Sequence, residues 1–322
     1  MGEQRQSCYG LSRKSEPAQP VTKPLGAPAM KRPILTCALL GGLLLSTAPV
    51  LAQSLADRIS HYDPAKTRDL KAVHGGAGTM NYMGLMDAKS LSTNFIFLHR
   101  GFLKPKGGIG QHFHNQCEEM FVILDGEAEF TVNGRTSRLT GPAGAPNRMG
   151  SSHAIYNPGD KPVEWMNINV GTSKTYDNFD LGDTREGAAL DPIPQFITMK
   201  LDKALLKPAA GQDGVSRRRA LGPSAFYTPW AYLDHVLVAP GAATATSRTP
   251  DMREAYYVIS GDGSVTVNGE TVAIKKGDAI PVDLDQAKSF KAGSTALELM
   301  VIGVAKDLET KKAFQAVAAN AF

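Results

Sequence analysis

The stretch that decides the fold is Gly107-Gly108-Ile109-Gly110-Gln111-His112-Phe113-His114-Asn115-Gln116-Cys117-Glu118-Glu119-Met120-Phe121-Val122-Ile123-Leu124-Asp125-Gly126. Residues two apart on a strand face the same side, so His112 and His114 can point inward together. A turn follows, and a strand that begins at Glu119 can bring its carboxylate beside the two imidazoles. Two nitrogens and one oxygen from adjacent strands suit a first-row divalent metal ion.

A further histidine, His153, lies within Gly150-Ser151-Ser152-His153-Ala154-Ile155-Tyr156-Asn157. The two stretches resemble the two motifs of the cupin family, in which His, one residue, His, four residues, Glu, six residues and Gly are followed later by Gly, His and Asn. The proline that normally stands two residues before the second glycine is missing, and Pro146 lies four residues before it, which leaves the loop shape open. The resemblance implies one divalent transition metal (Fe, Mn, Zn or Ni) on His112, His114, Glu119 and His153.

An internal repeat extends the argument to the rest of the chain. Asp125-Gly126-Glu127-Ala128-Glu129-Phe130-Thr131-Val132-Asn133-Gly134 recurs as Ser260-Gly261-Asp262-Gly263-Ser264-Val265-Thr266-Val267-Asn268-Gly269, at a fixed offset of 135 residues. The same offset pairs Glu119 with Glu254. Each copy consists of short strand patterns separated by Gly, Pro, Asn and Asp turns. The sequence therefore predicts an all-β fold with two jelly-roll β-barrels of cupin type, a linker and a short C-terminal helix.

The predicted domains are an N-terminal barrel with the metal site over 53–172, a linker over 173–219, a C-terminal barrel over 220–306 and a terminal helix over 307–322. A helix over 196–206 is predicted within the linker. The one tight basic run, Arg217-Arg218-Arg219, is interpreted as a solvated part of the same linker.

The repeat also tests the second barrel for a metal site. Ser247 and Thr249 stand where the first copy has His112 and His114, and Gln286 is assigned to the place of His153. Two hydroxyls, an amide and the Glu254 carboxylate make a poor transition-metal site. The second barrel is predicted to be metal-free and to serve stability, dimer contact or substrate closure, although Glu254 is kept as a candidate for binding a polar ligand.

The N-terminal residues predict export. Met30-Lys31-Arg32-Pro33 precedes an uncharged apolar run over 34–45 and small residues up to Ala52, which is the pattern of a secretory signal peptide over 30–52. The run is shorter than the roughly 20 residues that span a bilayer, so no membrane partner is expected after cleavage near Ala52. The mature protein would be periplasmic or secreted. Residues 1–29 are interpreted as a non-native extension or a disordered leader.

Charge and cysteine content narrow the partners. Residues 1–52 hold six of the 35 Lys and Arg and two of the 31 Asp and Glu, so 29 of each remain beyond them. A neutral mature chain gives no reason to expect nucleic acid, and a small-molecule substrate and a possible homodimer are predicted instead. Cys117 alone remains beyond the leader, so no intrachain disulfide can form.

The reaction stays open between three classes. A metal-dependent lyase or isomerase acting on a sugar acid or hydroxy acid is favoured; the alternatives are an iron-dependent dioxygenase of a phenolic or enediol substrate, and a non-catalytic small-ligand (carbohydrate) binding protein. Catalytic candidates are Glu119, if it leaves the metal, and Tyr156. The substrate-pocket candidates are Arg148, Phe121, Ile123 and Asn157.

Overall fold

The computed structural model describes residues 53–319 of the chain. The predicted leader (1–29) and signal peptide (30–52) lie outside the described residues, and export therefore stays a prediction. Within residues 53–319, no helix has the length and apolar character needed to cross a membrane.

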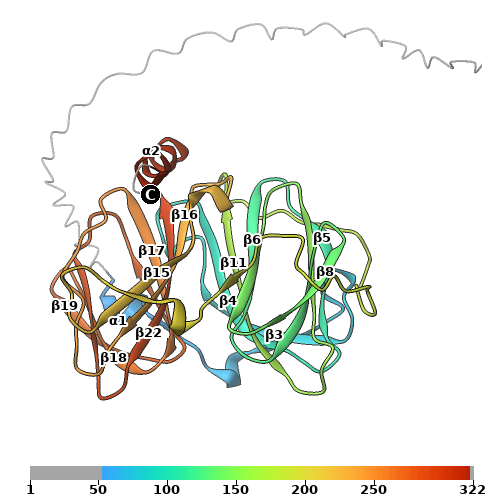
Figure 1. Ribbon diagram of the computed structural model, residues 1–322, viewed down its shortest axis with the longest axis horizontal. Helices are drawn as coiled ribbons and strands as arrows, with labels where there is room; N and C mark the ends of the chain where they lie inside the picture. The colour runs from blue at the N-terminus through green and yellow to red at the C-terminus, as the bar shows by residue number, and fades with distance from the viewer. Residues whose placement is uncertain (1–52, 320–322) are drawn as a thin grey trace, which may run out of the picture. The chain divides into compact units, whose positions relative to one another are not determined.

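The N-terminal copy of the repeat consists of one large and one small antiparallel sheet (Figure 1). The large sheet has the order β13 (Met199–Lys200), β9 (Ala143–Asn147), β6 (Cys117–Ile123), β11 (Val163–Gly171), β4 (Phe95–Leu103), β3 (Thr79–Met86) and β2 (Arg68–Lys71). The small sheet has the order β12 (Phe179–Asp180), β5 (Gly108–Phe113), β10 (Ser152–Tyr156), β7 (Glu127–Val132) and β8 (Arg135–Thr140).

The C-terminal copy repeats this arrangement. Its large sheet has the order β1 (Ser60–His61), β20 (Asp278–Val282), β17 (Met252–Ser260), β22 (Leu297–Ala305), β16 (Trp230–Val238), β15 (Val215–Leu221) and β14 (Lys207–Pro208), and its small sheet β19 (Glu270–Lys275), β18 (Asp262–Val267) and β21 (Lys288–Ala292). The bounds of β16, β18 and β20 are those of β4, β7 and β9 shifted by 135 residues. The sequence repeat is therefore a repeat of strands in register.

Each copy pairs one large sheet with one small sheet, which is the two-sheet form of the predicted jelly roll, and the four sheets of the described residues do not join into closed barrels. The all-β class and the C-terminal helix, α2 (Leu308–Ala319), are as predicted. The other helical turns are α1 (Leu55–Arg58), η1 (Pro64–Lys66), η2 (Val73–Gly75), η3 (Lys203–Leu205) and η4 (Pro223–Ala225).

Two short strands cross between the copies. β1, at the start of the described chain, pairs with β20 of the C-terminal copy, and β13 pairs with β9 of the N-terminal copy. The helix predicted over 196–206 is wrong, since this stretch holds β13 and the single turn η3. Met199 and Leu201 are buried and Lys200 is exposed, which is the alternation of a strand.

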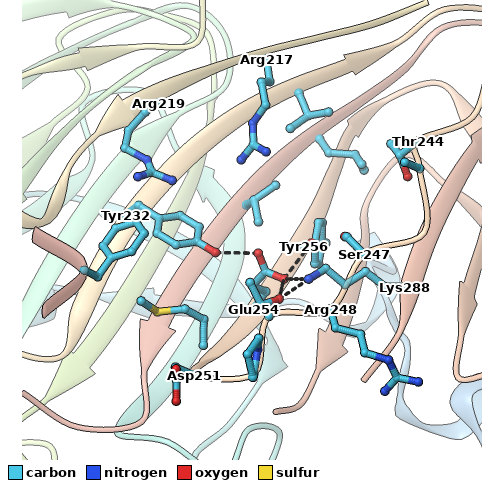
Figure 2. A pocket seen from close by; sticks show the side chains of 18 of the residues that line it. Arg217, Arg219, Tyr232, Thr244, Ser247, Arg248, Asp251, Glu254, Tyr256 and Lys288 are labelled. Carbon is cyan, nitrogen blue, oxygen red and sulfur yellow. Dashed lines mark hydrogen bonds and ion pairs between the residues drawn. The ribbon is translucent and has the colours of Figure 1, made fainter. Parts of the chain in front are cut away.

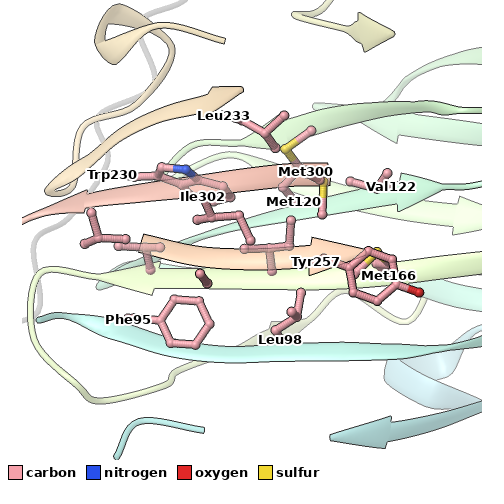
Figure 3. Packing of buried hydrophobic residues seen from close by; sticks show 14 of the residues in the cluster. Phe95, Leu98, Met120, Val122, Met166, Trp230, Leu233, Tyr257, Met300 and Ile302 are labelled. Atoms are coloured by element: carbon pink, nitrogen blue, oxygen red, sulfur yellow. The ribbon is translucent and has the colours of Figure 1, made fainter. Parts of the chain in front are cut away.

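The large sheets of the two copies share a hydrophobic core, seen in Figure 3. On β6, Met120 and Val122 point into this shared core, whereas Phe121 and Ile123 point into the interior of their own sandwich. Every residue of β6 is buried because both faces of the strand are covered. The shared core is built from both copies by Phe95, Leu98, Met120, Val122, Met166, Trp230, Leu233, Tyr257, Met300 and Ile302, among others.

A polar contact fixes the same junction. The carboxylate of Glu118, which is 1% exposed, accepts hydrogen bonds from the backbone N–H of Tyr227 at 2.7 Å and of Thr228 at 2.8 Å. Lys311 on α2 donates its ammonium hydrogens to the carbonyl oxygens of Phe226 and Thr228. Glu118 thus belongs to the contact between the copies.

Candidate metal centre

Three histidines converge because two paired strands carry them. His112 lies on β5, His114 follows the end of that strand, and His153 lies on β10, directly opposite His112 in the ladder. The alternation of side chains on β5 turns His112 and His114 to the interior. All three are at most 2% exposed.

The Nε2 atoms of the three imidazoles converge on one place. His153 Nε2 is 3.1 Å from His112 Nε2 and 3.3 Å from His114 Nε2. His112 Nδ1 lies 2.8 Å from the carbonyl oxygen of Gly110, and His114 Nδ1 contacts that of Asp177. A carbonyl oxygen can only accept, so each Nδ1 carries a proton and, in the neutral ring, Nε2 carries a lone pair that can bind a metal ion.

Glu119 supplies the oxygen of the set. Its Oε1 lies 3.8 Å from His112 Nε2 and 3.7 Å from His153 Nε2, and its Oε2 lies 3.7 Å from His114 Nε2. Burial alone would raise the pKa of Glu119, but the three imidazoles outweigh it and hold that pKa well below its ordinary value. The group is therefore an anionic oxygen donor.

Two asparagines that sequence reasoning missed hold this carboxylate in place. Asn167 and Asn169, both on β11, donate from Nδ2 to Oε1 of Glu119 at 2.8 Å and to Oε2 at 2.9 Å. The Asn-x-Asn spacing on a strand was the signal, because it places both amides on one face. Held at both oxygens, Glu119 is poorly placed to leave the site as a base.

The four predicted ligands fit one transition-metal ion. Their donor atoms all lie within 4.8 Å of one another, and the four side chains are buried. An ion about 2.1 Å from each nitrogen places neighbouring nitrogens ~3.0 Å apart in an octahedron and ~3.4 Å apart in a tetrahedron, which brackets the observed separations. Neutral imidazoles with one carboxylate are donors that Fe, Mn, Zn and Ni all accept.

A cavity of about 330 Å³ adjoins the site and reaches the Glu119 carboxylate. Most of its wall is apolar or aromatic, and the residues that line it include no Lys or Arg. The wall consists of Leu70, Val73, His74, Met80, Tyr82, Phe97, His99, Ile109, Glu119, Trp165, Asn167 and Tyr176.

Two predicted pocket residues lie behind the metal ligands and do not line this cavity. The ring of Phe121 stacks on His153 with centroids 4.4 Å apart, and Ile123 is fully buried in the interior core. Both side chains therefore support the ligands from behind.

The other predicted pocket residues lie elsewhere. Arg148 donates to the carbonyl oxygen of Ala225 at 2.9 Å, at the junction with the C-terminal copy. The amide of Asn157 donates to the backbone carbonyls of Leu103 and Lys104, at the end of β4, and of Lys161 in its own turn. The catalytic candidate Tyr156 follows Ile155 on β10 and turns to the other face, where its hydroxyl donates to Glu186 at 3.0 Å. None of the three lines the cavity beside the metal ligands.

His74 reaches the site through a backbone conformation that could not be predicted from the sequence. It sits in η2 with φ of 51°, stacks on His112 with centroids 4.0 Å apart, and places Nδ1 2.5 Å from Asp180 Oδ1. A Cβ on Gly110 would lie 2.2 Å from the carbonyl oxygen of His74, so only glycine allows η2 to approach β5 this closely. Gly110 was the one signal of this contact.

His99 and Cys117 are both uncharged neighbours of the ligands. His99 stacks on Phe97 with centroids 4.0 Å apart, and burial lowers its pKa to about 4. Burial also raises the pKa of the Cys117 thiol to about 12, so this side chain behaves as a small buried hydrophobe.

The corresponding place in the C-terminal copy contains an ion pair between two side chains. Lys288 on β21 pairs with Val267 across the ladder, as His153 pairs with Val132, so Lys288 occupies the position of His153. The assignment of Gln286 to this position is wrong, because Gln286 lies in the turn before β21 and accepts the N–H of Asp283. Lys288 Nζ lies 2.6 Å from Glu254 Oε2 (Figure 2).

Comparisons with known protein sequences support the repeat and the family. The cupin domain family matches residues 101–169 and 234–303. An uncharacterized protein of Methanocaldococcus jannaschii is 32% identical over 87 residues, which are 26% of this chain and 70% of that protein. An oxalate-binding protein of Thermotoga maritima is 25% identical over 111 residues, 34% of this chain and 89% of that protein. A mannose-1-phosphate guanylyltransferase of Klebsiella pneumoniae is 33% identical over 75 residues, 23% of this chain but only 16% of that enzyme's length.

Solved structures support the arrangement of both copies together. A salicylate 1,2-dioxygenase from Pseudaminobacter salicylatoxidans aligns over 73% of this chain and 78% of its own, with 18% identity and a TM-score of 0.54. An oxalate decarboxylase from Bacillus subtilis aligns over 77% and 76%, with 17% identity and a TM-score of 0.54. At this identity the likeness concerns the fold alone.

Proposed function

The chain belongs to the cupin family with two cupin domains, and from that premise we propose that it is a metal-dependent dioxygenase of small phenolic substrates. The ion would be held by His112, His114, Glu119 and His153. Such an ion supplies Lewis-acid chemistry and, if it is iron, the redox chemistry that oxygen activation needs. Four protein donors leave coordination positions for substrate.

The proposal rests on the apolar and aromatic lining of the adjoining cavity. A flat ring can pack against Tyr82, Phe97 and Trp165, and a cavity of about 330 Å³ is at the small end of ligand sites. A sugar acid would leave several hydroxyl groups without partners there, at a cost of about 1–3 kcal/mol for each buried one. Its carboxylate would also find no Lys or Arg among the residues that line the cavity. This wall therefore favours a phenolic ring over the sugar acid predicted first.

Two cavity residues would orient the ring. Asn167 binds Glu119 through Nδ2, while its Oδ1 is buried and has no hydrogen-bond partner among the described residues. That oxygen can accept a hydrogen from a phenolic hydroxyl that lies beside the metal ligands. His99 is uncharged at neutral pH and offers its flat face to the cavity.

Oxygen uptake tests the proposal. The full chain, loaded separately with Fe(II), Mn(II), Zn(II) or Ni(II), is mixed with catechol and a flavonol, which carry no carboxylate, and with salicylate and gentisate, which do and should react less well in a cavity without Lys or Arg. We expect metal-dependent oxygen consumption with at least one phenol, loss of it in His112→Ala, and retention in His61→Ala, whose imidazole lies on the C-terminal sheet. Assayed at saturating metal, Asn167→Leu should raise KM more than it lowers kcat. Absence of uptake with every metal and phenol contradicts the proposal, and phenol binding without turnover would favour a binding protein.

A second candidate, the lyase or isomerase, is favoured by the pair His74 and Asp180. A histidine bonded to a carboxylate and lining the cavity is placed as a general base would be, and no such base was recognisable in the sequence. This reaction would exchange a substrate C–H with solvent deuterium, without oxygen. Exchange in a uronate or hydroxy acid that is lost in His74→Gln would support it; exchange that persists in His74→Gln would exclude this base.

A further inference from the structure

The C-terminal copy holds a built-in cation where the N-terminal copy has a metal ligand. The ammonium of Lys288 contacts Glu254, and the hydroxyls of Tyr232 and Tyr256 donate to the same carboxylate at 2.6 and 3.0 Å. Thr249, the counterpart of His114, donates to it at 2.9 Å. Glu254 is 6% exposed and has four partners. Its carboxylate is therefore fully occupied by contacts within the protein. Glu254, a candidate for binding a polar ligand in the sequence analysis, instead holds the surrounding side chains in place.

A cavity of about 700 Å³ opens beside this ion pair. One side of its wall is apolar and includes Phe290, Leu299 and Val301 from the sheets of the sandwich. Helix α2 closes another part with Ala313 and Phe314. The remaining wall carries the cations Arg217, Arg219 and Arg248 beside Lys288, as Figure 2 shows. The volume lies within the usual range of small-molecule sites.

Two of these arginines share one carboxylate. Arg217 and Arg219 lie two residues apart on β15, on the same face, and both bond the buried Asp234. They therefore belong to a strand of the C-terminal sheet and not to the predicted linker, although both side chains are partly solvated, at 52% and 35% exposed. One carboxylate cannot neutralise two guanidinium groups, so one positive charge is left over. The other charges of the wall have partners nearby, because Lys288 is paired with Glu254, Asp251 with Lys306, and Arg248 lies 4.0 Å from Asp285.

Two aromatic rings position the guanidinium group of Arg219. The guanidinium of Arg219 lies over the ring of Tyr232, 4.4 Å from its centroid, and over that of Phe314, 5.0 Å from its centroid. In Figure 2 the guanidinium groups of Arg217 and Arg219 both point toward the Tyr232 and Glu254 pair. Two neighbouring guanidinium groups are suited to binding a planar carboxylate through parallel hydrogen bonds.

We infer that this cavity is a binding site for a small organic acid, with one carboxylate on Arg217 and Arg219 and an apolar body against Phe290, Leu299 and Val301. A single surplus charge matches a monoanion better than a phosphate, and the apolar wall would gain from covering a hydrocarbon body. The site is separate from the metal centre, so it stands whether or not the proposed oxygenase activity does.

Calorimetric titration of the full-length chain tests the inference with two acids, benzoate and octanoate, and with uncharged 1-octanol. We expect at least one acid to bind. Arg217→Gln should raise its Kd by about tenfold, the loss of one charge-assisted contact. Asp234 keeps Arg219 as a partner in this variant, so the fold should be retained. Ala313→Trp, which adds a bulky side chain to the part of the wall formed by α2 without changing charge, should abolish binding.

Arg218→Gln is the matched control, since it removes the same charge from the neighbouring residue, whose side chain bonds the carbonyl oxygen of Lys200 and does not line the cavity. It should leave the Kd unchanged. The inference is overturned if neither acid binds, if 1-octanol binds as tightly as octanoate, if Arg217→Gln and Arg218→Gln weaken binding equally, or if Ala313→Trp has no effect.

Discussion

At the scale of single residues, two asparagine side chains outside the cupin motifs position a ligand of the metal centre. Asn169 donates to Glu119 Oε2 from a fully buried position, and Asn167 does the same for Oε1. Partners of this kind fix the orientation of a ligand before the metal arrives. The carboxylate is therefore kept in one position by β11.

We expect Asn169→Ala to weaken metal binding about 10- to 100-fold, because Glu119 would lose one of its two fixed contacts. Competition with a metal-binding dye measures the effect. The control is Asn94→Ala, which removes an exposed amide that bonds only the carbonyl oxygen of Thr172. Equal affinities in the two variants would show that Asn169 does not position the ligand.

The ligands could be predicted from the sequence and their surroundings could not. His112, His114, Glu119 and His153 follow from spacing along strands, which depends only on local geometry. His74 reaches the site through a positive φ and a tight approach to Gly110, and these depend on long-range packing. Gln286 was misplaced for another reason. The strict offset of 135 leads from His153 to Lys288, and a protonated lysine has no lone pair for a metal ion, so the sequence pattern does not mark it as the successor of a ligand.

At the scale of elements, β22 ties its neighbours together through Glu298, which is 3% exposed. The carboxylate accepts from His235 on β16 at 2.9 Å and from Ser260 on β17 at 2.7 Å, and Lys203 of η3 lies 2.9 Å away. Burial alone would raise the pKa of Glu298, but these contacts outweigh it and lower the pKa to about 2.

This shift predicts a pH dependence of stability. The pKa of Glu298 is lower in the folded chain than its ordinary value of 4.5, so the stabilisation is complete above pH 4.5 and is lost as the pH falls toward 2. The contribution is at most roughly 3 kcal/mol. Urea unfolding at several pH values should give a shallower acid loss in Glu298→Gln than in the unaltered chain. Glu309→Gln, at an exposed position on α2, should leave the slope unchanged. Identical slopes for all three proteins would refute the assignment.

The strands and turns of the repeat could be predicted because each is a local pattern. The short strands β1 and β13 could not, because two residues carry no periodicity and their pairing joins distant parts of the chain. The triplet at Arg217 was misread for a related reason. Alternation places Arg217 and Arg219 on a different face from Arg218, but a run of like charges hides this period.

At the scale of the whole described molecule, the shared core makes the two copies one folding unit. Met120 and Val122 of the N-terminal copy lie in the same hydrophobic cluster as Trp230 and Ile302 of the C-terminal copy. Separating the copies would expose this core to water at a cost of roughly 25 cal/mol for each Å² of apolar surface. We therefore expect the copies to unfold together.

The chain has two tryptophans, and one lies in each copy, Trp165 on β11 and Trp230 on β16. Trp230→Phe leaves fluorescence from the N-terminal copy alone, and Trp165→Phe leaves it from the C-terminal copy alone. Within each variant, urea curves from fluorescence and from circular dichroism should coincide. A fluorescence transition displaced from the circular dichroism curve would show that the copies unfold separately.

One metal ion is predicted to bind in the N-terminal copy, while Lys288 takes the corresponding place in the C-terminal copy. Metal analysis of the purified chain, after incubation with Fe, Mn, Zn and Ni salts and removal of excess metal, tests it most directly, with His153→Ala and His61→Ala as a matched pair. We predict one ion per chain in the unaltered protein and in His61→Ala, and none in His153→Ala. Two ions per chain, or one that persists in His153→Ala, would contradict the account.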